Sequence, residues 1–212
     1  MRNQFCLRLL HHTSSLFEAV LTTRFCNVVF AVDAFERYVS TRAFRLGRDA
    51  SLVFSEPNAG GQSVVSEALS MEYMHQLFGA VDVVTEMQIE YWSPNWKKVD
   101  YLCSIRGERV AVSVTRAMTF QGSTFGLAES RALLRKKLHG LVVAKSGVCV
   151  SQRYVKSILH IWCQTHAMAD LLAQCYADVV VSLDITENVV LIATVAAAEA
   201  AIFTNDESVI ES

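Results

Sequence analysis

The sequence predicts a single α/β domain, in which a mixed β-sheet carries helices on its faces. Three observations lead to this prediction. The chain has 212 residues, enough for one well-buried domain and few for two. Its hydrophobic fraction is 52% and it has only two prolines, which argues against a disordered chain. Segments with the two-residue period of strands also alternate with segments of helical period.

The N-terminal part, residues 1–54, is predicted to be a helical extension. Apolar and aromatic residues at mixed spacing in residues 14–46 favour one or two helices. The first 17 residues carry two arginines, two histidines and no acidic residue. This composition is compatible with a mitochondrial presequence. We favour the alternative, that this stretch is the first helix of the folded protein.

The main domain is predicted to span residues 55–203. Turn-forming residues at 55–61 indicate a loop, and Ser63 can then cap a helix that ends near Gly79. Strand patterns follow at residues 83–92, 97–106 and 109–116. Beyond them we expect a helix, a strand, a helix and two strands, at residues 125–140, 155–163, 166–176, 179–185 and 189–195. The order is therefore α-β-β-β-α-β-α-β-β, and residues 204–212 form a C-terminal tail.

Glu67 is a carboxylate on the apolar face of the first helix of this domain. Four apolar residues share that face at helical spacing: Val64, Met71, Met74 and Phe78. An ionised carboxylate in such surroundings is costly unless it is paired or bound to a cation. A metal site would explain Glu67. The alternative is a position at the edge of the face, with a backbone N–H or an arginine as partner.

The hairpin between the second and third strands determines which side chains share a face. Gly107 and Glu108 suit a two-residue type II′ turn, which places Asp100 opposite Thr115. Because side chains alternate along a strand, Asp100, Ser113 and Thr115 converge on one face, and the other face is thoroughly apolar. A solvent-exposed face with ordinary polar alternation is the alternative interpretation.

A basic segment lies in the middle of an otherwise acidic chain. The whole chain has a net charge of −2, but residues 104–156 carry ten Lys and Arg against two acidic residues, a net charge of +8. This charge suits a polyanionic partner such as nucleic acid, and a solvated helix face is the alternative explanation. The residues expected to contact phosphates are Arg116, Arg131, Arg135, Lys136 and Lys137.

Membrane and secreted classes find little support in the sequence. The most apolar stretch, residues 189–203, is about 15 residues long, short of the ~20 that a membrane-spanning helix needs. The six cysteines are scattered and form no CxxC pair, as expected for reduced thiols of an intracellular protein. We therefore expect a protein of the cytoplasm or nucleus, with the mitochondrion as the alternative noted above.

Two further groups of residues could carry chemistry. His160, Cys163 and His166 are zinc-ligand residue types, but residues three apart on a strand point to opposite faces, which favours packing over metal binding. Trp92 and Trp96 flank a proline between two predicted strands. They could stack on bases in a nucleic-acid reader, and we favour the alternative that they cover the end of the sheet.

From residue 61 to about residue 184, the chain resembles the PD-(D/E)XK nuclease-like superfamily, which has the restriction-endonuclease-like fold. The family pattern is a Glu on the first helix, an Asp at the start of the second strand, and (D/E)-x-K on the third strand. Glu67 and Asp100 match the first two elements. The third element maps onto Ser113-Val114-Thr115, where both the carboxylate and the lysine are missing.

The resemblance implies metal-dependent hydrolysis of phosphodiester bonds. Asp100 would be the principal ligand of Mg²⁺, and Glu67 a supporting ligand or the base that orients the water. Ser113 and Thr115 would complete the catalytic site through hydrogen bonds to a water molecule. Neither hydroxyl can supply the positive charge of the missing lysine.

This departure leaves two main hypotheses open. In the first, the domain is a nuclease with a degenerate active site, and Glu129, Lys136 or Lys137 of the next helix replaces the missing groups. In the second, it is a catalytically inactive module that binds nucleic acid or serves as a scaffold. A third hypothesis is a subunit of a larger assembly, which binds a protein partner or a second copy of itself.

Overall fold

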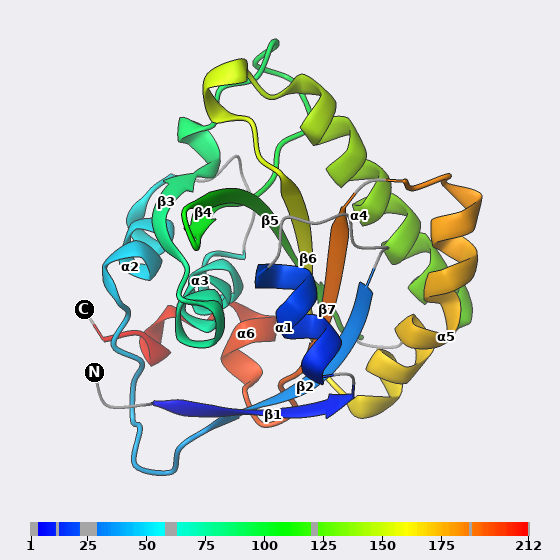
Figure 1. Cartoon of the computed structure of the whole chain (residues 1–212). Helices are drawn as coiled ribbons and strands as arrows, with labels where there is room; N and C mark the ends of the chain where they lie inside the picture. Colours follow the sequence, from blue (N-terminus) through cyan, green and yellow to red (C-terminus); the bar gives the residue numbers. More distant parts are fainter. Residues whose placement is uncertain are drawn as a thin grey trace.

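The structure is a computed structural model that describes residues 4–11, 13–21, 29–57, 63–119, 123–186 and 188–211. A seven-stranded mixed sheet forms its centre, and helices cover both faces (Figure 1). The predicted α/β class, with a mixed sheet between helices, is therefore confirmed.

Every strand within the described residues belongs to the same sheet, in the order β1-β2-β7-β6-β5-β4-β3. The strands are β1 (Phe5–His11), β2 (Val29–Arg37), β3 (Val81–Thr85), β4 (Tyr101–Ile105), β5 (Glu108–Ala117), β6 (Lys156–Cys163) and β7 (Val189–Val195). The four central strands β2, β7, β6 and β5 run parallel. The outer strands β1, β4 and β3 pair antiparallel. Strands β6 and β7 are buried along their whole length, as is typical of parallel strands with helices on both faces.

The helices divide between the two faces of the sheet. They are α1 (Thr13–Leu21), α2 (Arg48–Ser55), α3 (Val64–Phe78), α4 (Leu127–Gly147), α5 (His166–Ser182) and α6 (Ala200–Thr204). Three short 3-10 turns complete the structure: η1 (Glu86–Gln88), η2 (Val150–Gln152) and η3 (Glu207–Val209). One apolar core contains residues of α1, α2, α3 and α6, and the other contains residues of α4 and α5.

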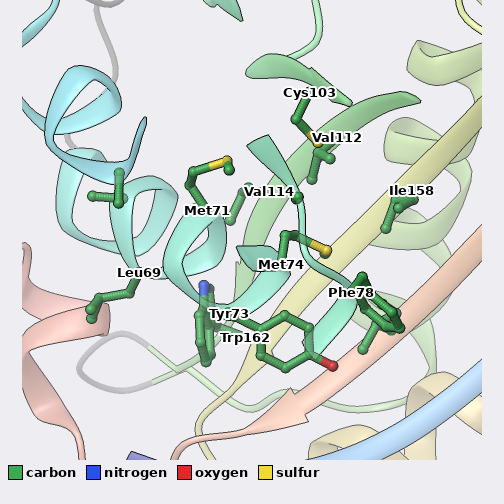
Figure 2. Packing of buried hydrophobic residues seen from close by; sticks show 14 of the residues in the cluster. Leu69, Met71, Tyr73, Met74, Phe78, Cys103, Val112, Val114, Ile158 and Trp162 are labelled. Carbon is green, nitrogen blue, oxygen red and sulfur yellow. The ribbon is translucent and has the colours of Figure 1, made fainter. Parts of the chain in front are cut away.

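Helix α3 is the most deeply buried element on its face. Figure 2 shows Tyr73, Met74 and Phe78 of this helix in the same cluster as Val112 of β5 and Trp162 of β6. The helix ends at Gly79, whose backbone is left-handed with φ 68°, a conformation that glycine adopts without strain. The predicted helix after Ser63 and its glycine stop are confirmed.

The N-terminal part differs from the predicted helical extension. Residues 14–46 contain all but the first residue of α1, so one predicted helix is present, but residues 29–37 form β2, and β1 precedes both. Strand β2 lies between β1 and β7 within the main sheet. Its residues 31–35 are all buried, so the alternation that marks a half-exposed strand is missing from the sequence.

A predicted strand at residues 179–185 is wrong, because α5 continues to Ser182. Leu172, Cys175 and Val179 are buried at helical spacing, whereas Val181 is 80% exposed on the outer side of the helix. The valines favour a strand by local propensity, and packing on the sheet outweighs that preference. The predicted element order thus loses one of its last two strands.

Two other predictions shift or fall outside the structure. The strand predicted at residues 83–92 lies earlier, as β3, and is followed by η1. The helix predicted at residues 125–140 extends further, as α4. The loop predicted at residues 55–61 falls mostly on positions 58–62, which are outside the described residues.

The hairpin between β4 and β5 has a different register from the predicted one. Arg106 and Gly107 form the turn, with φ 51° and 80°, as a type I′ turn requires. Tyr101 pairs with Val112, and the Asp100 N–H donates to the carbonyl of the same residue, so Asp100 lies beside Val112 and not opposite Thr115. A shift of two residues leaves the faces unchanged. The apolar face packs against α3, and the other face, with Leu102 and Ala111, is covered by α4, so the solvent-face alternative is wrong.

Candidate functional site

The candidate site lies where β4 begins beside β5. The Asp100 N–H donates to the Val112 carbonyl at 3.1 Å, so Asp100 and Tyr101, the first residue of β4, both lie beside Val112. The next N–H along β5 on that side belongs to Val114, and it donates to Asp100 Oδ2 at 2.6 Å. The Ser113 hydroxyl donates to the same oxygen at 2.9 Å. The Asp100 carboxylate therefore lies in the plane of the sheet, where backbone of a longer β4 would run.

Lys137 reaches the same point from α4. Its Nζ donates to the carbonyl oxygen of Val114 at 3.2 Å. In an antiparallel pair the N–H and C=O of one residue point to the same side of the strand, so Lys137 and Asp100 hold adjacent positions at this edge of β5. Burial lowers the pKa of Lys137, while the negative charges of Asp100 and Glu67 raise it.

Glu67 approaches the site on the first turn of α3. Its side chain accepts a hydrogen bond from Ser63 Oγ, and the residue is only 7% exposed. Burial raises the pKa of the Glu67 carboxyl to about 7, with the charge of Asp100 as the second cause. The Ser63 hydrogen bond and Lys137 act in the opposite direction. The charge of Asp100 therefore affects the pKa values of both Glu67 and Lys137, and these two residues also affect each other.

The sheet itself explains how α3 and α4 can contribute to one site. The two helices lie on opposite faces of the sheet, as the separate apolar cores and Figure 1 show. Side chains from opposite faces meet only where the sheet has an opening. The start of β4 is such a place, because there the side chains of Asp100 and Lys137 take over the hydrogen bonds of Val114.

A third acid near this site was not predicted. The charge of Glu86, on η1, contributes to raising the pKa of Glu67 and that of Tyr91. The Tyr91 hydroxyl accepts a hydrogen bond from the N–H of Val99, the residue before Asp100, at 3.1 Å. The sequence pattern predicts a strand that continues through Glu86. It therefore does not show that Glu86 directly follows the end of β3. An acid directly after a strand is the signal that could have identified it.

The carboxylates set limits on the metal that this site could hold. Across the part of the chain that the structure describes, there is no group of three or more His, Cys, Asp or Glu side chains that could hold a metal ion. Glu67 and Asp100 remain as two oxygen ligands. Mg²⁺ is commonly bound through one or two carboxylates, waters and substrate phosphates, so this donor set fits Mg²⁺ better than a metal held by protein ligands alone.

Two predicted groups have other positions or tasks. Thr115 is half-buried on β5, two residues beyond Ser113 and on the same side of the strand. Glu129 accepts a hydrogen bond from the Gly126 N–H at 2.9 Å and caps the start of α4. Glu129 thus stabilises the start of α4, and it is Lys137 of this helix that reaches the site.

The predicted phosphate-contacting residues do not share one surface. Arg131 pairs with Asp178 of α5 at 3.4 Å, and Arg135 donates to Ser182 of α5 at 3.1 Å. Both contacts lie at the surface between the two helices. Lys136 is exposed.

Arg116 has a structural contact on the other face of the sheet. Its Nη1 donates to the carbonyl oxygens of Ile202 and Phe203 at 3.2 Å each. These carbonyls lie near the end of α6, where a cation is favourable. The five cations therefore do not lie on one surface, and their contact with phosphates stays a prediction.

The zinc-ligand alternative also fails in the structure. His160 is fully buried, and its ring nitrogens form hydrogen bonds with Ser70 Oγ at 2.8 Å and Thr194 Oγ1 at 2.9 Å. Cys163 belongs to the core on the opposite face of the sheet. The preference for packing over metal binding is confirmed for these two residues.

Comparisons with known proteins provide one relative. The chain is 34% identical over 171 residues to the AAC-rich mRNA clone AAC4 protein of Dictyostelium discoideum. The match covers 77% of this chain and 25% of that protein, and the name states no activity. No protein-family model and no solved structure matches the chain. Among the described residues, no helix is long and apolar enough to cross a membrane.

Proposed function

We propose that this chain is a nuclease-like domain that engages nucleic acid and hydrolyses phosphodiester bonds at a site formed by Glu67, Asp100 and Lys137. One observation carries the proposal. Asp100 accepts a hydrogen bond from the N–H of Val114, and Lys137 donates one to the carbonyl of the same residue. The charges of both residues also affect the pKa of Glu67. An acid pair beside a half-buried ammonium group is the set of charges that such hydrolysis needs.

The order of elements supports the restriction-endonuclease-like fold as part of this proposal. Helix α3, strands β3, β4 and β5, helix α4 and strand β6 follow one another as the family pattern requires. Glu67 lies on the first of these helices, and Asp100 directly precedes the second of these strands. The third family element maps onto residues 113–115 of β5, beside Asp100.

Lys137 is the group that replaces the missing lysine in this proposal. The family pattern places the lysine on the third strand, where this chain has Thr115. The Lys137 ammonium group reaches the carbonyl of Val114, one residue before that position. A positive charge can therefore lie beside the acid pair although β5 supplies none.

Each of these residues has a distinct task. The two hydrogen bonds from Ser113 and Val114 hold the Asp100 carboxylate in one orientation. Glu67, with a pKa of about 7, can accept a proton from the attacking water near neutral pH. Lys137 stabilises the negative charge that develops on the phosphate. Mg²⁺ held by Asp100 would supply further stabilisation of that charge.

Cleavage of labelled single-stranded and double-stranded oligonucleotides, with and without Mg²⁺, tests the proposal. We expect Mg²⁺-dependent cleavage that Asp100→Ala and Lys137→Met each reduce by about 100-fold or more. Arg48→Met, which removes an exposed cation of α2, is the control and should cleave at a rate close to that of the wild type. Equal activity in Asp100→Ala, or no cleavage by any form of the protein, rejects the catalytic proposal.

A second candidate function is a binding module without catalysis. It is favoured by the missing third carboxylate, since no three-acid metal group is present in the described residues. This function predicts affinity for nucleic acid that does not depend on Mg²⁺ and weakens with salt. Affinity that is constant across salt concentrations would argue against a phosphate-dominated surface.

A further inference from the structure

The loop of residues 92–98 is fixed along one side of α4. Trp96 Nε1 donates to the Val143 carbonyl at 2.7 Å, and the Trp92 N–H donates to the Gly147 carbonyl at 2.9 Å. The Trp96 ring lies directly on the helix backbone, because a Cβ on Gly147 would be 2.0 Å from Trp96 Nε1. The loop lies at the top of the molecule in Figure 1, beside the C-terminal end of α4.

Lys97 extends this loop toward the candidate site. Its side chain passes over Gly140, since a Cβ there would lie 3.1 Å from Lys97 Cε. Gly140 and Lys137 are three residues apart and so are neighbours on the helix surface. The charges of Lys97 and Lys136 both lower the pKa of Lys137. Three ammonium groups thus lie near one another, an arrangement that a phosphate anion stabilises.

Trp92 is placed differently from Trp96. It is 70% exposed, so the expectation that both tryptophans cover the end of the sheet is wrong for this one. Its backbone is held by Gly147, next to the bridge between Tyr91 and Val148. The nearest acid along the chain, Glu90, accepts a hydrogen bond from Ser151 at 3.4 Å and is thereby directed toward η2. A large aromatic ring on a fixed backbone is a suitable surface for a nucleobase.

The spacing along α4 matches a short run of nucleotides. Trp92 is anchored at Gly147, Lys97 lies over Gly140, and Lys137 marks the candidate site. Ten residues of helix separate the first and last of these positions, about 15 Å. Nucleotides of one strand are spaced at about 3.4 Å when stacked, so about four would span this length.

We propose that this surface, Trp92 with Lys97 and Lys136, is a binding track for single-stranded nucleic acid that leads to the candidate active site. Trp92 stacks on an unpaired base, and the two lysines contact backbone phosphates. A duplex keeps its bases stacked inside the helix and cannot offer one to Trp92. The inference rests on the proposed function and adds the substrate class to it.

Binding of labelled oligonucleotides to the full chain, measured by fluorescence anisotropy without Mg²⁺, tests the track. The probes are a deoxythymidine strand, a uridine strand and a duplex. We expect Trp92→Ala to weaken binding of the single strands by about tenfold, whereas Trp92→Phe retains most of the affinity. Lys97→Ala should reduce the salt dependence of log K by about one phosphate equivalent. Val181→Ala, an exposed change on α5, is the control and should bind as the wild type does.

The results separate this inference from the proposed function. Equal single-strand affinity in Trp92→Ala and wild type overturns the track, and so does a preference for the duplex. Weakened binding in Trp92→Ala, with no cleavage by any form, retains the track and rejects the nuclease. Cleavage that requires Asp100, with unchanged binding by Trp92→Ala, rejects the track and retains the nuclease. The relative affinities of the two single strands decide between DNA and RNA.

Discussion

At the scale of single residues, the candidate site is destabilising for the folded chain. Glu67 is buried, and its neighbours include the charge of Asp100, so its ionised form is unfavourable there. Its raised pKa means that the folded state binds a proton more tightly than the unfolded state. Glu67 therefore contributes stability below about pH 4.5, its ordinary pKa, and that contribution is lost as the pH rises to about 7.

Glu67→Gln should stabilise the protein at alkaline pH and change little in acid. Glutamine stays neutral, so the variant avoids the cost of an ionised carboxyl, about 2 to 3 kcal/mol near pH 8. The free energy of unfolding from denaturant titrations near pH 8 and near pH 4 measures the difference. Glu18→Gln, at an exposed position of α1, is the matched control and should shift stability by less than about 0.5 kcal/mol at both pH values. A gain from Glu67→Gln that is the same at both pH values contradicts the assignment.

The residues of the site differ in how well the sequence predicts them. Glu67 and Asp100 are predictable, because each departs from a local apolar pattern. The hydrogen bond from Ser113 to Asp100 depends on the true turn, and Arg106 gives little sign that it adopts a positive φ. The sequence does not predict that Lys137 belongs to the site, because Lys137 reaches Val114 of β5 only through the packing of α4 on the sheet.

At the scale of elements, α4 supports the site through its two glycines. Both are buried on the side of the helix that faces the loop of residues 92–98. At Gly147 the nearest group is a rigid indole ring, whereas at Gly140 it is the flexible end of Lys97. The same substitution should therefore have opposite outcomes at these two positions.

Gly147→Ala should displace the loop, and Gly140→Ala should be tolerated. A methyl group at Gly147 would overlap the Trp96 ring, and we expect a loss of about 1 to 3 kcal/mol together with loss of the bond to Val143. At Gly140 the lysine can move aside, and alanine favours the helix by up to about 1 kcal/mol. Thermal unfolding and tryptophan emission compare the pair. A Gly147→Ala variant as stable as Gly140→Ala, with unchanged emission, would show that Trp96 is not packed on this helix.

Among the elements, those bounded by a clear cap or turn signal are predictable, and those without one are less so. The helix at residues 64–78 and the strands around Gly107 follow their patterns closely. Strand β2 and the end of α5 do not, because continuous apolar runs lack a clear period. Only the packing partners of these runs, β7 for β2 and the sheet for α5, decide their structure.

At the scale of the whole molecule, a buried polar chain connects elements far apart in the sequence. The Tyr101 hydroxyl bonds to Ser70, Ser70 to His160, and His160 to Thr194. On the same face of the sheet, the Tyr73 hydroxyl donates to Asp33 of β2. All of these groups are buried, so each hydrogen bond is needed to offset the loss of water. These hydrogen bonds connect α3 to four strands of the sheet, β4, β6, β7 and β2.

Asp33 makes this network sensitive to pH. Burial raises the pKa of its carboxyl to about 6, and hydrogen bonds from Thr194 and Tyr73 hold it lower than burial alone would. Asp33 therefore contributes stability below about pH 3.8, which is lost as the pH rises to about 6. Without the hydrogen bond from Tyr73, the pKa of Asp33 is higher still. The loss of stability on ionisation of Asp33 then continues to a higher pH.

Tyr73→Phe should consequently cost more stability near pH 8 than near pH 5. We expect a loss of about 1 to 3 kcal/mol near pH 8, where the ionised carboxylate lacks its donor, and a smaller loss near pH 5, where the carboxyl is mostly protonated. Tyr101→Phe is the matched control. It removes another buried hydroxyl, whose partner Ser70 does not titrate, so its cost should be the same at both pH values. If Tyr73→Phe behaves like Tyr101→Phe, the Asp33 carboxyl is not the group that makes the core respond to pH.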